Sequence, residues 1–419
     1  MGDSIEDIVT NDLCISCGAC SAFKQQSKYV MKENTSRGMY LPEQVRKKKS
    51  DIGTEINVCP GKGYEIVKMG LELFPEARNV DIDLGRWNRI FSGGTTDKRV
   101  AKNASSGGVM TEIAKFLLDT SVIDGVVVTS FNYGESGPRP NVKIVSTVEE
   151  LLVAQGSKYC PVPVLDIIPE IKKFKGKILF IGTPCQIAGL RLLQAQDKSL
   201  QDKVPFTIGN FCGGFRDLRE TDTLIKRAGI KVEDVISFRY RGNGQPGSML
   251  IKDTGGKVAE LPYPDYARMT GVVKHRRCQL CVDATAELAD FSCGDAWIDR
   301  FLNTNEAWSL VITRSENAGK VIDDMVLNGN IKVETVTVDE VKNSQAGNLT
   351  SKKRRQLARR KLYTALGIKL PEFDGSYHTN VGGMFLEVKV YLSHMFFSKL
   401  EKFGFYKIFA KLIGRYPKR

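Results

Sequence analysis

Four cysteines near the start of the chain constrain its folding more than any other feature. Cys14, Cys17 and Cys20 lie within seven residues, and a fourth, Cys59, is followed directly by Pro60. Three thiolates this close wrap one edge of a compact cluster, and a proline often follows the last cysteine of bacterial-type ferredoxin sites. Structural zinc usually takes two separated Cys-x-x-Cys pairs. The spacing therefore favours a 4Fe-4S cluster, with zinc or unliganded thiols as the alternatives.

A second set of cysteines has weaker ligand spacing. Cys278 and Cys281 form a Cys-x-x-Cys pair, while Cys185 and Cys212 each follow an apolar stretch typical of a buried strand. Parallel strands bring their carboxyl ends to one edge of a sheet, where open α/β folds gather their sites. We therefore predict that these four cysteines hold a second 4Fe-4S cluster. Buried inert thiols, zinc or another choice of ligands are the alternatives.

The cysteine content also bears on the compartment. The chain has ten cysteines, and its first residues, with Asp3, Glu6 and Asp7, lack the basic start and apolar stretch of a secretory signal. In a reducing compartment, clustered thiols are metal ligands or redox groups rather than disulfides. No stretch reaches the 18 or so apolar residues of a membrane-spanning helix. We expect a cytoplasmic protein in which Cys160 and Cys293, which lack a partner at ligand spacing, are core residues.

Beyond the first cysteines, the chain alternates glycine turns, helical patterns and apolar stretches, as α/β domains do. Buried strands are predicted at residues 122–129, 177–181 and 206–212. Helices are predicted at residues 109–118 and 186–196, and a hairpin insertion at residues 236–261. The fold class is therefore α/β.

Seven short motifs follow one another along the chain. They are Ala104–Gly108, Gly156–Tyr159, Gly182–Gln186, Phe211–Gly214, Tyr240–Asn243, Cys278–Cys281 and Ala289–Trp297. In this order they resemble the beta-subunit family of coenzyme F420 hydrogenases and dehydrogenases, which also contains chlorophyll-cycle reductases. The resemblance spans roughly residues 10–345. Each motif alone is weak, but the combination is specific.

The resemblance implies a cytoplasmic flavoprotein that binds FAD and carries one or two 4Fe-4S clusters. It also implies electron transfer between these clusters and a hydride-carrying small molecule such as coenzyme F420. The expected protein partner is a ferredoxin or a hydrogenase or dehydrogenase subunit. The residues carried over as flavin-binding are Ser105, Ser106, Gly107, Gly108, Ser157, Lys158, Tyr159, Thr183, Gly294 and Asp295.

Physical chemistry gives reasons for these residue types. A Ser/Gly loop that opens a helix offers N–H donors and a positive helix end to a flavin phosphate or ring edge, although an ordinary capped helix has the same pattern. Lys158 places positive charge beside a reduced flavin and Tyr159 offers a ring, or the two form a surface pair. Gly294, Asp295 and Trp297 supply a turn, a carboxylate and an aromatic plane, as does a buried Trp beside a capping Asp.

The chain departs from the family pattern after Cys212. Many relatives have a histidine at the next position, where this chain has Gly213. Only three histidines occur, and His275 is the one near a motif. Hydride transfer needs positioning more than a strong base, so we assign no catalytic residue, and the substrate is the property that this departure puts in doubt.

These observations divide the chain into four parts. Residues 1–75 form a ferredoxin-like 4Fe-4S segment, joined by a linker around residues 74–86 to a mixed α/β flavin-binding core. The core has an N-terminal part, residues 86–175, and a C-terminal part with the second cluster motif, residues 176–345. Residues 346–419 form a basic amphipathic helical tail.

The formal net charge of +13 resides almost entirely in this tail. From Ser351 onward, sixteen Lys and Arg face four Asp and Glu, a net of +12. The run around residues 352–361 has the composition of a solvated helix face. Apolar residues from Phe385 to Ile413 recur near helical spacing among basic residues. This pattern favours peripheral contact with an anionic membrane, with docking on a partner or on the protein's own body as alternatives. No recognition module supports nucleic-acid binding.

Three functions agree with the sequence. The first is an oxidoreductase with its own site for a deazaflavin, a tetrapyrrole-like or a sugar-linked substrate. The second is an electron-relay subunit that connects partner proteins. The third is a zinc-stapled scaffold without redox work.

Overall fold

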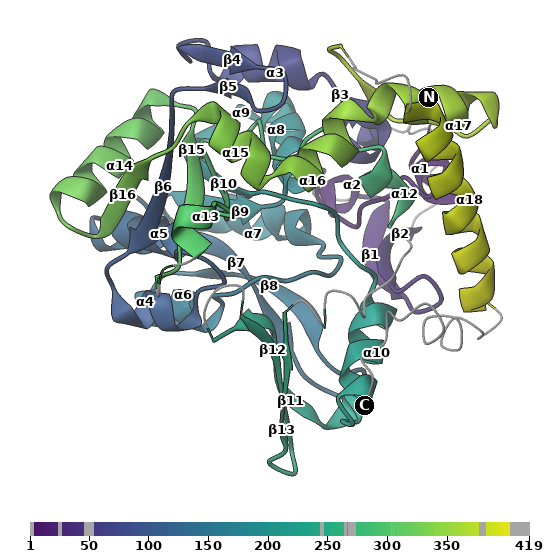
Figure 1. The fold of residues 1–419 in the computed structure, drawn as a ribbon, viewed down its shortest axis with the longest axis horizontal. Coiled ribbons are helices and arrows are strands. Elements are labelled where there is room, and N and C mark those ends of the chain that lie inside the picture. Colours follow the sequence, from purple (N-terminus) through teal and green to yellow (C-terminus); the bar gives the residue numbers. More distant parts are fainter. Residues whose placement is uncertain are drawn as a thin grey trace.

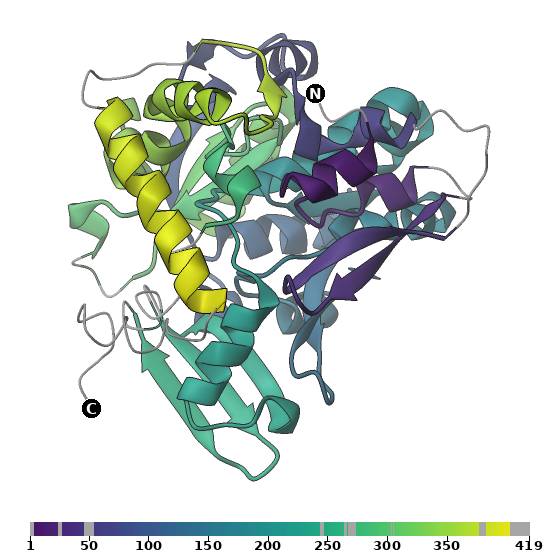
Figure 2. The ribbon, with the colours of Figure 1, turned by 90° about the vertical axis from the view of Figure 1, so that its right-hand side faces the viewer.

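The fold is built around one eight-stranded mixed sheet (Figures 1 and 2). The structure, a computed structural model, describes residues 4–23, 27–45, 54–243, 247–263, 266, 274–302, 304, 306–376 and 383–402. The strand order is β16-β6-β15-β14-β10-β9-β7-β8. The strands, in this order, are Ile331–Thr335, Arg89–Thr95, Ser309–Thr313, Phe291–Asp295, Phe206–Asn210, Ile178–Gly182, Gly125–Asn132 and Arg139–Val145.

The centre of the sheet is parallel and its sides are antiparallel. Strands β14, β10, β9 and β7 run parallel to one another, whereas β8, β15, β6 and β16 are added by antiparallel pairing. The three predicted strands are present as β7, β9 and β10. Strand β7 begins at Gly125 rather than at 122, because the Val122 and Ile123 N–H groups bond to the Leu117 carbonyl to end the preceding helix. The mixed α/β class is confirmed.

Both faces of the sheet are covered by helices, as the buried central strands require. One face packs on α5 (Val109–Asp119), α6 (Val148–Val153) and α14 (Glu316–Leu327). The other packs on α7 (Ile168–Lys173), α8 (Pro184–Gln196) and α9 (Lys198–Lys203). Side chains alternate between the two cores along each strand, so that Phe180 joins the second core and Leu179 the first.

The N-terminal segment lies on the second face. It contains the helices α1 (Ile5–Thr10) and α2 (Ala19–Ala22) and the antiparallel strands β1 (Tyr29–Asn34) and β2 (Met39–Gln44). Short 3-10 turns follow at Thr54–Val58 and Pro60–Lys62, then strand β3 (Gly63–Tyr64) and α3 (Ile66–Leu73). Ile15, Val58 and Tyr64 pack in the same core as α8. This segment is therefore continuous with the body in its packing.

Further elements connect or extend the core. The helices are α4 (Lys98–Asn103), α10 (Leu218–Arg227), α12 (Arg276–Gln279), α13 (Asp299–Leu302), α15 (Val338–Ser344) and α16 (Ala346–Leu349), with 3-10 turns at Val164–Ile167 and Val232–Asp234. A small antiparallel pair comprises β4 (Asn79–Asp81) and β5 (Gly85–Trp87). The predicted insertion is a three-stranded sheet, β11 (Val235–Gly242), β12 (Ser248–Asp253) and β13 (Val258–Pro262), which projects from the body at the bottom of Figure 1.

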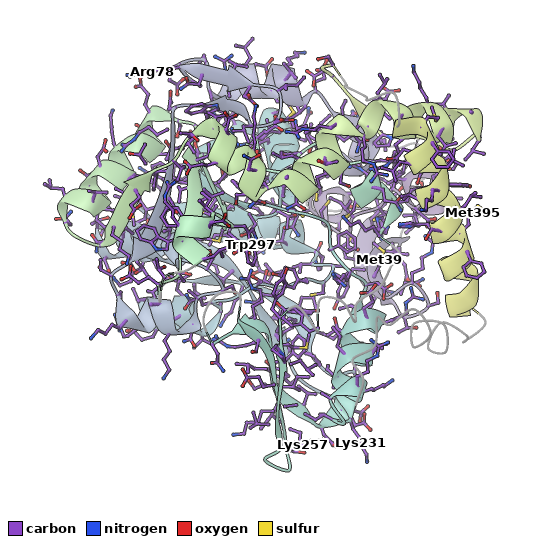
Figure 3. The ribbon with its side chains drawn as sticks, viewed as in Figure 1. Met39, Arg78, Lys231, Lys257, Trp297 and Met395 are labelled. Atoms are coloured by element: carbon purple, nitrogen blue, oxygen red, sulfur yellow. The ribbon has the colours of Figure 1, made fainter. Side chains whose placement is uncertain are left out.

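The segment after residue 345 begins as part of the body. A π-helical turn, Thr350–Arg354, leads into α17 (Gln356–Ala365), and strand β17 (Glu372–Phe373) pairs in parallel with β3. Helix α18 (Gly383–Lys402) packs against α17 along the rim of the molecule, where Figure 3 labels Met395. The predicted amphipathic pattern beyond residue 402 lies outside the described residues. Within those residues, no helix is both long enough and apolar enough to cross a membrane.

Candidate functional site

Three neighbouring parallel strands end at one edge of the sheet and position the residues of the site. Strand β9 leads into Thr183 and Cys185, β10 leads into Cys212, and β14 ends at Asp295. Parallel strands place their carboxyl ends together, and this edge is where open α/β folds bind ligands. The expectation that the sheet brings Cys185 and Cys212 to a common edge therefore agrees with the observed register.

A cavity of about 360 Å³ opens at this edge, within the range of small-molecule sites. It is lined by the residues predicted to bind flavin, except Gly107, and by the second set of cysteines. These are Ser105, Ser106, Gly108, Ser157, Lys158, Tyr159, Thr183, Gly294, Asp295, Cys185, Cys212, Cys278 and Cys281. Cys160 and Cys293 are buried, as expected for core residues, and also reach the cavity wall.

Gly107 belongs to the Ser/Gly loop but does not line the cavity. A Cβ atom on this residue would lie 2.4 Å from the Gly93 carbonyl oxygen and 2.6 Å from the Ser309 nitrogen. Only glycine permits this approach of the loop to β6 and β15. The next residue, Gly108, has a φ of +75° and caps α5. The Ser/Gly motif thus presses the start of α5 against the sheet beside the cavity.

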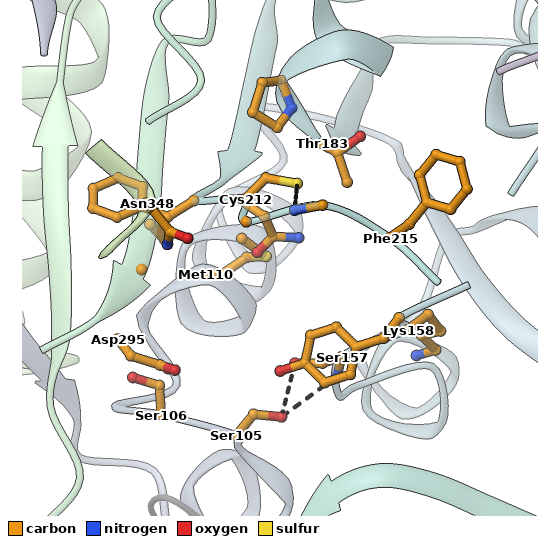
Figure 4. A pocket seen from close by; sticks show the side chains of 18 of the residues that line it. Ser105, Ser106, Met110, Ser157, Lys158, Thr183, Cys212, Phe215, Asp295 and Asn348 are labelled. Atoms are coloured by element: carbon orange, nitrogen blue, oxygen red, sulfur yellow. Dashed lines mark hydrogen bonds between the residues drawn. The ribbon is translucent and has the colours of Figure 1, made fainter. Parts of the chain in front are cut away.

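Serine side chains join the two loops that form one wall. The Ser157 N–H and hydroxyl lie 3.4 and 3.3 Å from the Ser105 Oγ atom, and Ser106 donates to the Trp308 carbonyl at 2.7 Å. Figure 4 shows Ser105 and Ser157 on the lower side of the cavity, opposite Thr183 and Cys212. These contacts therefore fix the two loops to each other along this wall of the cavity.

Arg241 is a functional candidate that sequence analysis did not select. Its side chain is buried, and Nη1 donates to Asp295 Oδ2 at 2.6 Å and to the Tyr159 hydroxyl at 3.5 Å. Its Nη2 atom donates to the Ser105 carbonyl. Burial lowers the pKa of Arg241, but the Asp295 carboxylate and Tyr159 more than offset this effect and raise it. Arg241 thereby joins three of the predicted flavin loops; its only sequence signal was membership of the Tyr240–Asn243 motif.

Lys158 lies between two cavities. Its ammonium donates to the Ala154 carbonyl and, at 2.9 Å, to the Gly156 carbonyl. Burial and the neighbouring Arg239 lower the pKa of Lys158 to about 7. A second cavity on the far side of this loop is lined by Lys158, Arg239 and the aromatic residues Phe131, Tyr133 and Phe238. The charge of Lys158 is consequently sensitive to pH near neutrality.

The second set of cysteines surrounds one end of the main cavity. Thr183 and Gln186 form a capping box that starts α8 and fixes Cys185 in its first turn. The Gly214 N–H donates to Cys212 Sγ at 3.3 Å (Figure 4). Burial raises the pKa of Cys185 to about 12 and that of Cys278 to about 11, with a further contribution from Cys212 in both cases. The four thiols thus share one low-dielectric site.

A buried lysine faces these thiols. Lys352 is 2% exposed, and its ammonium lies 3.5 Å from Cys281 Sγ and 2.7 Å from the Asp283 carbonyl oxygen. Gln356 donates to the Cys281 carbonyl at 3.0 Å, which fastens the same segment to the Cys-x-x-Cys loop. The sequence predicts that the basic run around residues 352–361 is a solvated helix face, but its first residue, Lys352, is buried.

The first set of cysteines lies in the N-terminal segment, apart from the cavity. Burial raises the pKa of Cys14 to about 12, and Cys59 contributes to the raised pKa of Cys14, Cys17 and Cys20. The chain reverses sharply between these thiols, with φ of +58° at Ser16 and +87° at Gly18. The four predicted ligands are thus buried near one another and interact electrostatically.

Arg277 connects the two sets. It is 1% exposed, and it donates from Nη2 to the Pro60 carbonyl at 2.7 Å and from Nε to the Gly61 carbonyl at 3.2 Å. Its guanidinium also lies 4.9 Å from the centre of the Phe373 ring. The residue before Cys278 is thereby attached to the residues after Cys59.

Two hydroxyl groups near the thiols are buried and have no hydrogen-bond partner among the described residues. One is Ser16 Oγ, between Cys14 and Cys17, and the other is the Tyr64 hydroxyl, which interacts electrostatically with Cys281 and Cys185. No group of three or more His, Cys, Asp or Glu side chains in the described part of the chain is placed to hold a metal ion. A four-iron cluster spreads its thiolates further apart than a zinc ion, whose sulfur ligands lie about 2.3 Å from the metal.

Two family models match the core. Residues 90–169 match the N-terminal model, and residues 175–339 the C-terminal model, of the coenzyme F420 hydrogenase/dehydrogenase beta subunit. The chain belongs to this family. The family match ends before the segment that carries Lys352.

Relatives of the beta-subunit family support this placement. The coenzyme F420 hydrogenase beta subunit of Methanothermobacter thermautotrophicus is 28% identical over 265 residues, which are 62% of this chain and 88% of that protein. The corresponding subunit of Methanococcus voltae is 27% identical over 262 residues, with 62% and 87% covered. A coenzyme F420-dependent sulfite reductase of Methanocaldococcus jannaschii is 24% identical over 350 residues, 79% of this chain and 49% of that protein.

A solved structure shares the fold. A chain of the F420-reducing NiFe hydrogenase complex from Methanosarcina barkeri superposes with a TM-score of 0.54. The superposition covers 70% of this chain and 98% of that chain, at 22% identity. The mixed α/β architecture of this beta-subunit family member thus matches that of a hydrogenase-complex subunit.

Proposed function

We propose that this chain is an iron-sulfur flavoprotein oxidoreductase. It passes electrons between two 4Fe-4S clusters, FAD and a hydride-carrying small molecule such as coenzyme F420, in a reducing compartment and in association with a redox partner subunit. The observation that carries this proposal is the shared cavity: the cysteines predicted for the second cluster and the residues predicted for flavin line the same space. Homologues named as coenzyme F420-dependent enzymes support the same reaction class.

The cavity has polar groups suited to a flavin. FAD held here would supply the exchange between a two-electron hydride carrier and one-electron clusters. Arg241 holds Asp295 and the Ser105 carbonyl in fixed positions, which preorganises the wall around the ligand. The loop at Ser105 and Ser106 presents the start of α5 to negative charge. These groups would bind and orient FAD, and the second cysteine set would hold the cluster that exchanges electrons with it.

Both cysteine sets have features that fit a cluster. The orphan hydroxyls of Ser16 and Tyr64 are donors beside thiols, and donors to sulfur tune cluster potentials. Arg277, the residue before Cys278, donates to the carbonyls of Pro60 and Gly61, which follow Cys59. We infer that electrons move between the first set, in the N-terminal segment, and the second set, at the cavity.

Metal and flavin analysis tests this proposal. The full chain, purified without oxygen, is expected to contain about eight iron and eight sulfide per chain if both clusters are present, together with FAD. Zinc without sulfide or flavin would refute the redox function and favour a zinc-stapled scaffold. The same sample also tests the cluster count, because four irons would leave only one set occupied.

A second measurement distinguishes an enzyme with its own substrate from a relay. Reduced coenzyme F420 and other hydride donors are added anaerobically to the isolated chain while flavin absorbance is followed. Bleaching of the flavin by a small donor supports the enzyme. Flavin that is reduced only through a partner protein supports the electron-relay subunit.

The exposed apolar side chains of helix α18 favour peripheral contact of the protein with an anionic membrane. Its inner face is polar: Glu387 is 1% exposed and pairs with Arg355 and Arg359. Its outer face is apolar, with Phe385 80% exposed and Leu392 57% exposed. A helix that turns a carboxylate inward and aromatic and aliphatic side chains outward presents an apolar surface to its surroundings. The basic sequence that follows complements anionic lipid.

A further inference from the structure

Lys352 differs from the three cations that follow it. Lys353 pairs with Glu287 at 2.5 Å, Arg354 with Asp83 at 3.2 Å, and Arg355 with Glu387 at 2.5 Å. Lys352 has no carboxylate within ion-pairing distance among the described residues, and instead its ammonium faces Cys281 Sγ at 3.5 Å. Four consecutive cations thus have four different partners, and only the partner of Lys352 is a thiol.

Burial makes this arrangement costly without an anion. Moving an ammonium out of water costs several kcal/mol unless a counter-charge or a metal site compensates it. The Asp283 carboxylate accepts from the Thr285 and Glu287 N–H groups and forms no ion pair with Lys352. The Asp283 carbonyl supplies a hydrogen bond at 2.7 Å but no net charge. Cys281, Cys212 and Cys278 interact with the Lys352 ammonium more strongly than the Asp283 carboxylate does, so the larger part of the compensating negative charge comes from the cysteine side.

We propose that Lys352 is the counter-charge of the second cluster and sets the potential at which that cluster takes up an electron. This inference rests on the proposed function. Reduction adds one electron to the cluster and moves no proton or bond, so a fixed cation nearby stabilises the reduced state more than the oxidised state. In a buried, weakly screened site this effect is retained at physiological salt. Lys352 thereby raises the midpoint potential of the second cluster.

Lys352 belongs to a segment of this chain that follows the part matched by the family models. The π-helical turn Thr350–Arg354 presents it to the thiols, and Gln356 and Arg359 bond to the carbonyls of Cys281 and Gln279. The segment lies beyond the family match, which ends at residue 339. The segment that follows the core therefore contributes Lys352 to the second cysteine set, whose thiols all come from the core.

Anaerobic redox titration of the full chain, followed by electron paramagnetic resonance, tests this role. The signal that disappears in Cys281→Ser is assigned to the second cluster. Lys352→Met is expected to shift the midpoint of that signal to a more negative potential, and Lys352→Arg, which keeps the charge, to restore most of it. Arg354→Met is the matched control, because this cation lies on the same turn but is 45% exposed and paired with Asp83; its midpoint stays at the wild-type value.

Iron and sulfide content separates the possible failures. An unchanged midpoint in Lys352→Met, with a full complement of iron, overturns the inference and leaves the proposed function standing. Loss of the second cluster in Lys352→Met but not in Lys352→Arg supports a role for charge, whereas loss in both overturns it. A wild-type chain without any signal that depends on Cys281 refutes the second cluster itself.

Discussion

Arg277 Nη2 donates a hydrogen bond of 2.7 Å to the carbonyl of Pro60, and this contact joins two cysteine motifs separated by more than 200 residues. The bond is buried, and the same guanidinium also reaches the Gly61 carbonyl. Arg277 therefore helps to fix the relative position of the two cysteine sets, together with the core packing of the N-terminal segment.

Replacement of Arg277 should weaken the whole chain. Arg277→Met leaves the Pro60 and Gly61 carbonyls without this donor, and each unsatisfied buried group costs about 1–3 kcal/mol. We expect a loss of roughly 2–5 kcal/mol in the free energy of unfolding, measured by urea denaturation of the metal-free chain. Arg276→Met is the comparison: Arg276 also reaches the N-terminal segment, at the Asn11 carbonyl and Asp12, but its side chain is part-exposed, so a smaller loss is expected. A variant at Arg277 as stable as wild type would show that the contact does not hold the two sets together.

Single cysteine replacements should remove one cluster each. Cys17→Ser is expected to remove the iron of the first set and Cys281→Ser that of the second, while flavin stays bound in both. Cys293→Ser is a matched control, since this thiol lines the cavity wall but has no predicted ligand role. Iron, sulfide and flavin are assayed on the same samples. Full iron retention in Cys17→Ser would contradict the first ligand assignment.

The Arg241 side chain should govern flavin affinity. Arg241→Ala leaves Asp295 without its ion pair and releases the Ser105 loop, so the cavity wall is no longer preorganised. We expect FAD to bind at least about tenfold more weakly, equivalent to about 1.4 kcal/mol, in equilibrium dialysis with the deflavinated chain. Arg239→Ala, on the same strand but in the neighbouring cavity, is expected to have a smaller effect. Equal affinity in Arg241→Ala and wild type would remove this residue from the site.

Lys158 should make stability depend on pH. Its pKa of about 7 in the folded chain lies below the ordinary value of 10.5. Between these pH values the unfolded chain carries a proton that the folded chain lacks, so the free energy of unfolding rises with pH, by up to about 1.4 kcal/mol per pH unit. Below pH 7 both forms are protonated and this slope vanishes. Lys158→Met is expected to remove the rise, in urea denaturation at pH 7 to 9.

The surface lysine Lys175 provides the comparison for that experiment. Lys175 is exposed, and Lys175→Met is expected to keep the wild-type dependence on pH. If Lys158→Met and wild type gain stability in parallel as pH rises, the ammonium of Lys158 is not the group responsible.

The outer face of α18 should bind anionic vesicles. Phe385→Glu combined with Leu392→Glu is expected to lower co-sedimentation with phosphatidylserine vesicles, because apolar contact is lost and negative charge is added. Leu327→Glu is the control, since Leu327 on α14 is 86% exposed on another part of the surface. Unchanged vesicle binding in the double variant, or equal loss in the control, would exclude this face; retention of a protein partner on it would favour partner docking.

Sequence reasoning reached the sheet edge because its signals are local. The strands before Cys185 and Cys212 are short apolar runs, and parallel pairing places their ends together whatever lies between them. The Ser/Gly motif likewise predicts the start of α5 through backbone geometry alone. These parts of the fold and of the cavity follow from patterns within about ten residues, which is the range over which periodicity and turn chemistry act.

The contacts that sequence reasoning missed are between distant segments. Nothing near Lys352 distinguishes it from Lys353 in the sequence, because the difference is which residue the π-helical turn points at Cys281. Arg277 stands beside a cysteine motif, but its partners at Pro60 and Gly61 are more than 200 residues away. The polar inner face of α18 is hidden for the same reason, since Glu387 is explained only by Arg355 and Arg359.

The pairing of β17 with β3 has a consequence for the order of assembly. Phe373 pairs with Tyr64, and the Asp374 carboxylate accepts from the Val67 and Lys68 N–H groups at 2.9 and 2.8 Å, across 307 and 306 residues of chain. During synthesis, β3 and the start of α3 therefore cannot make these contacts until residues 372–374 have been translated. The first cysteine loop, by contrast, is complete once residue 59 has emerged. The cluster proposed for the first set could therefore be loaded before β17 pairs with β3.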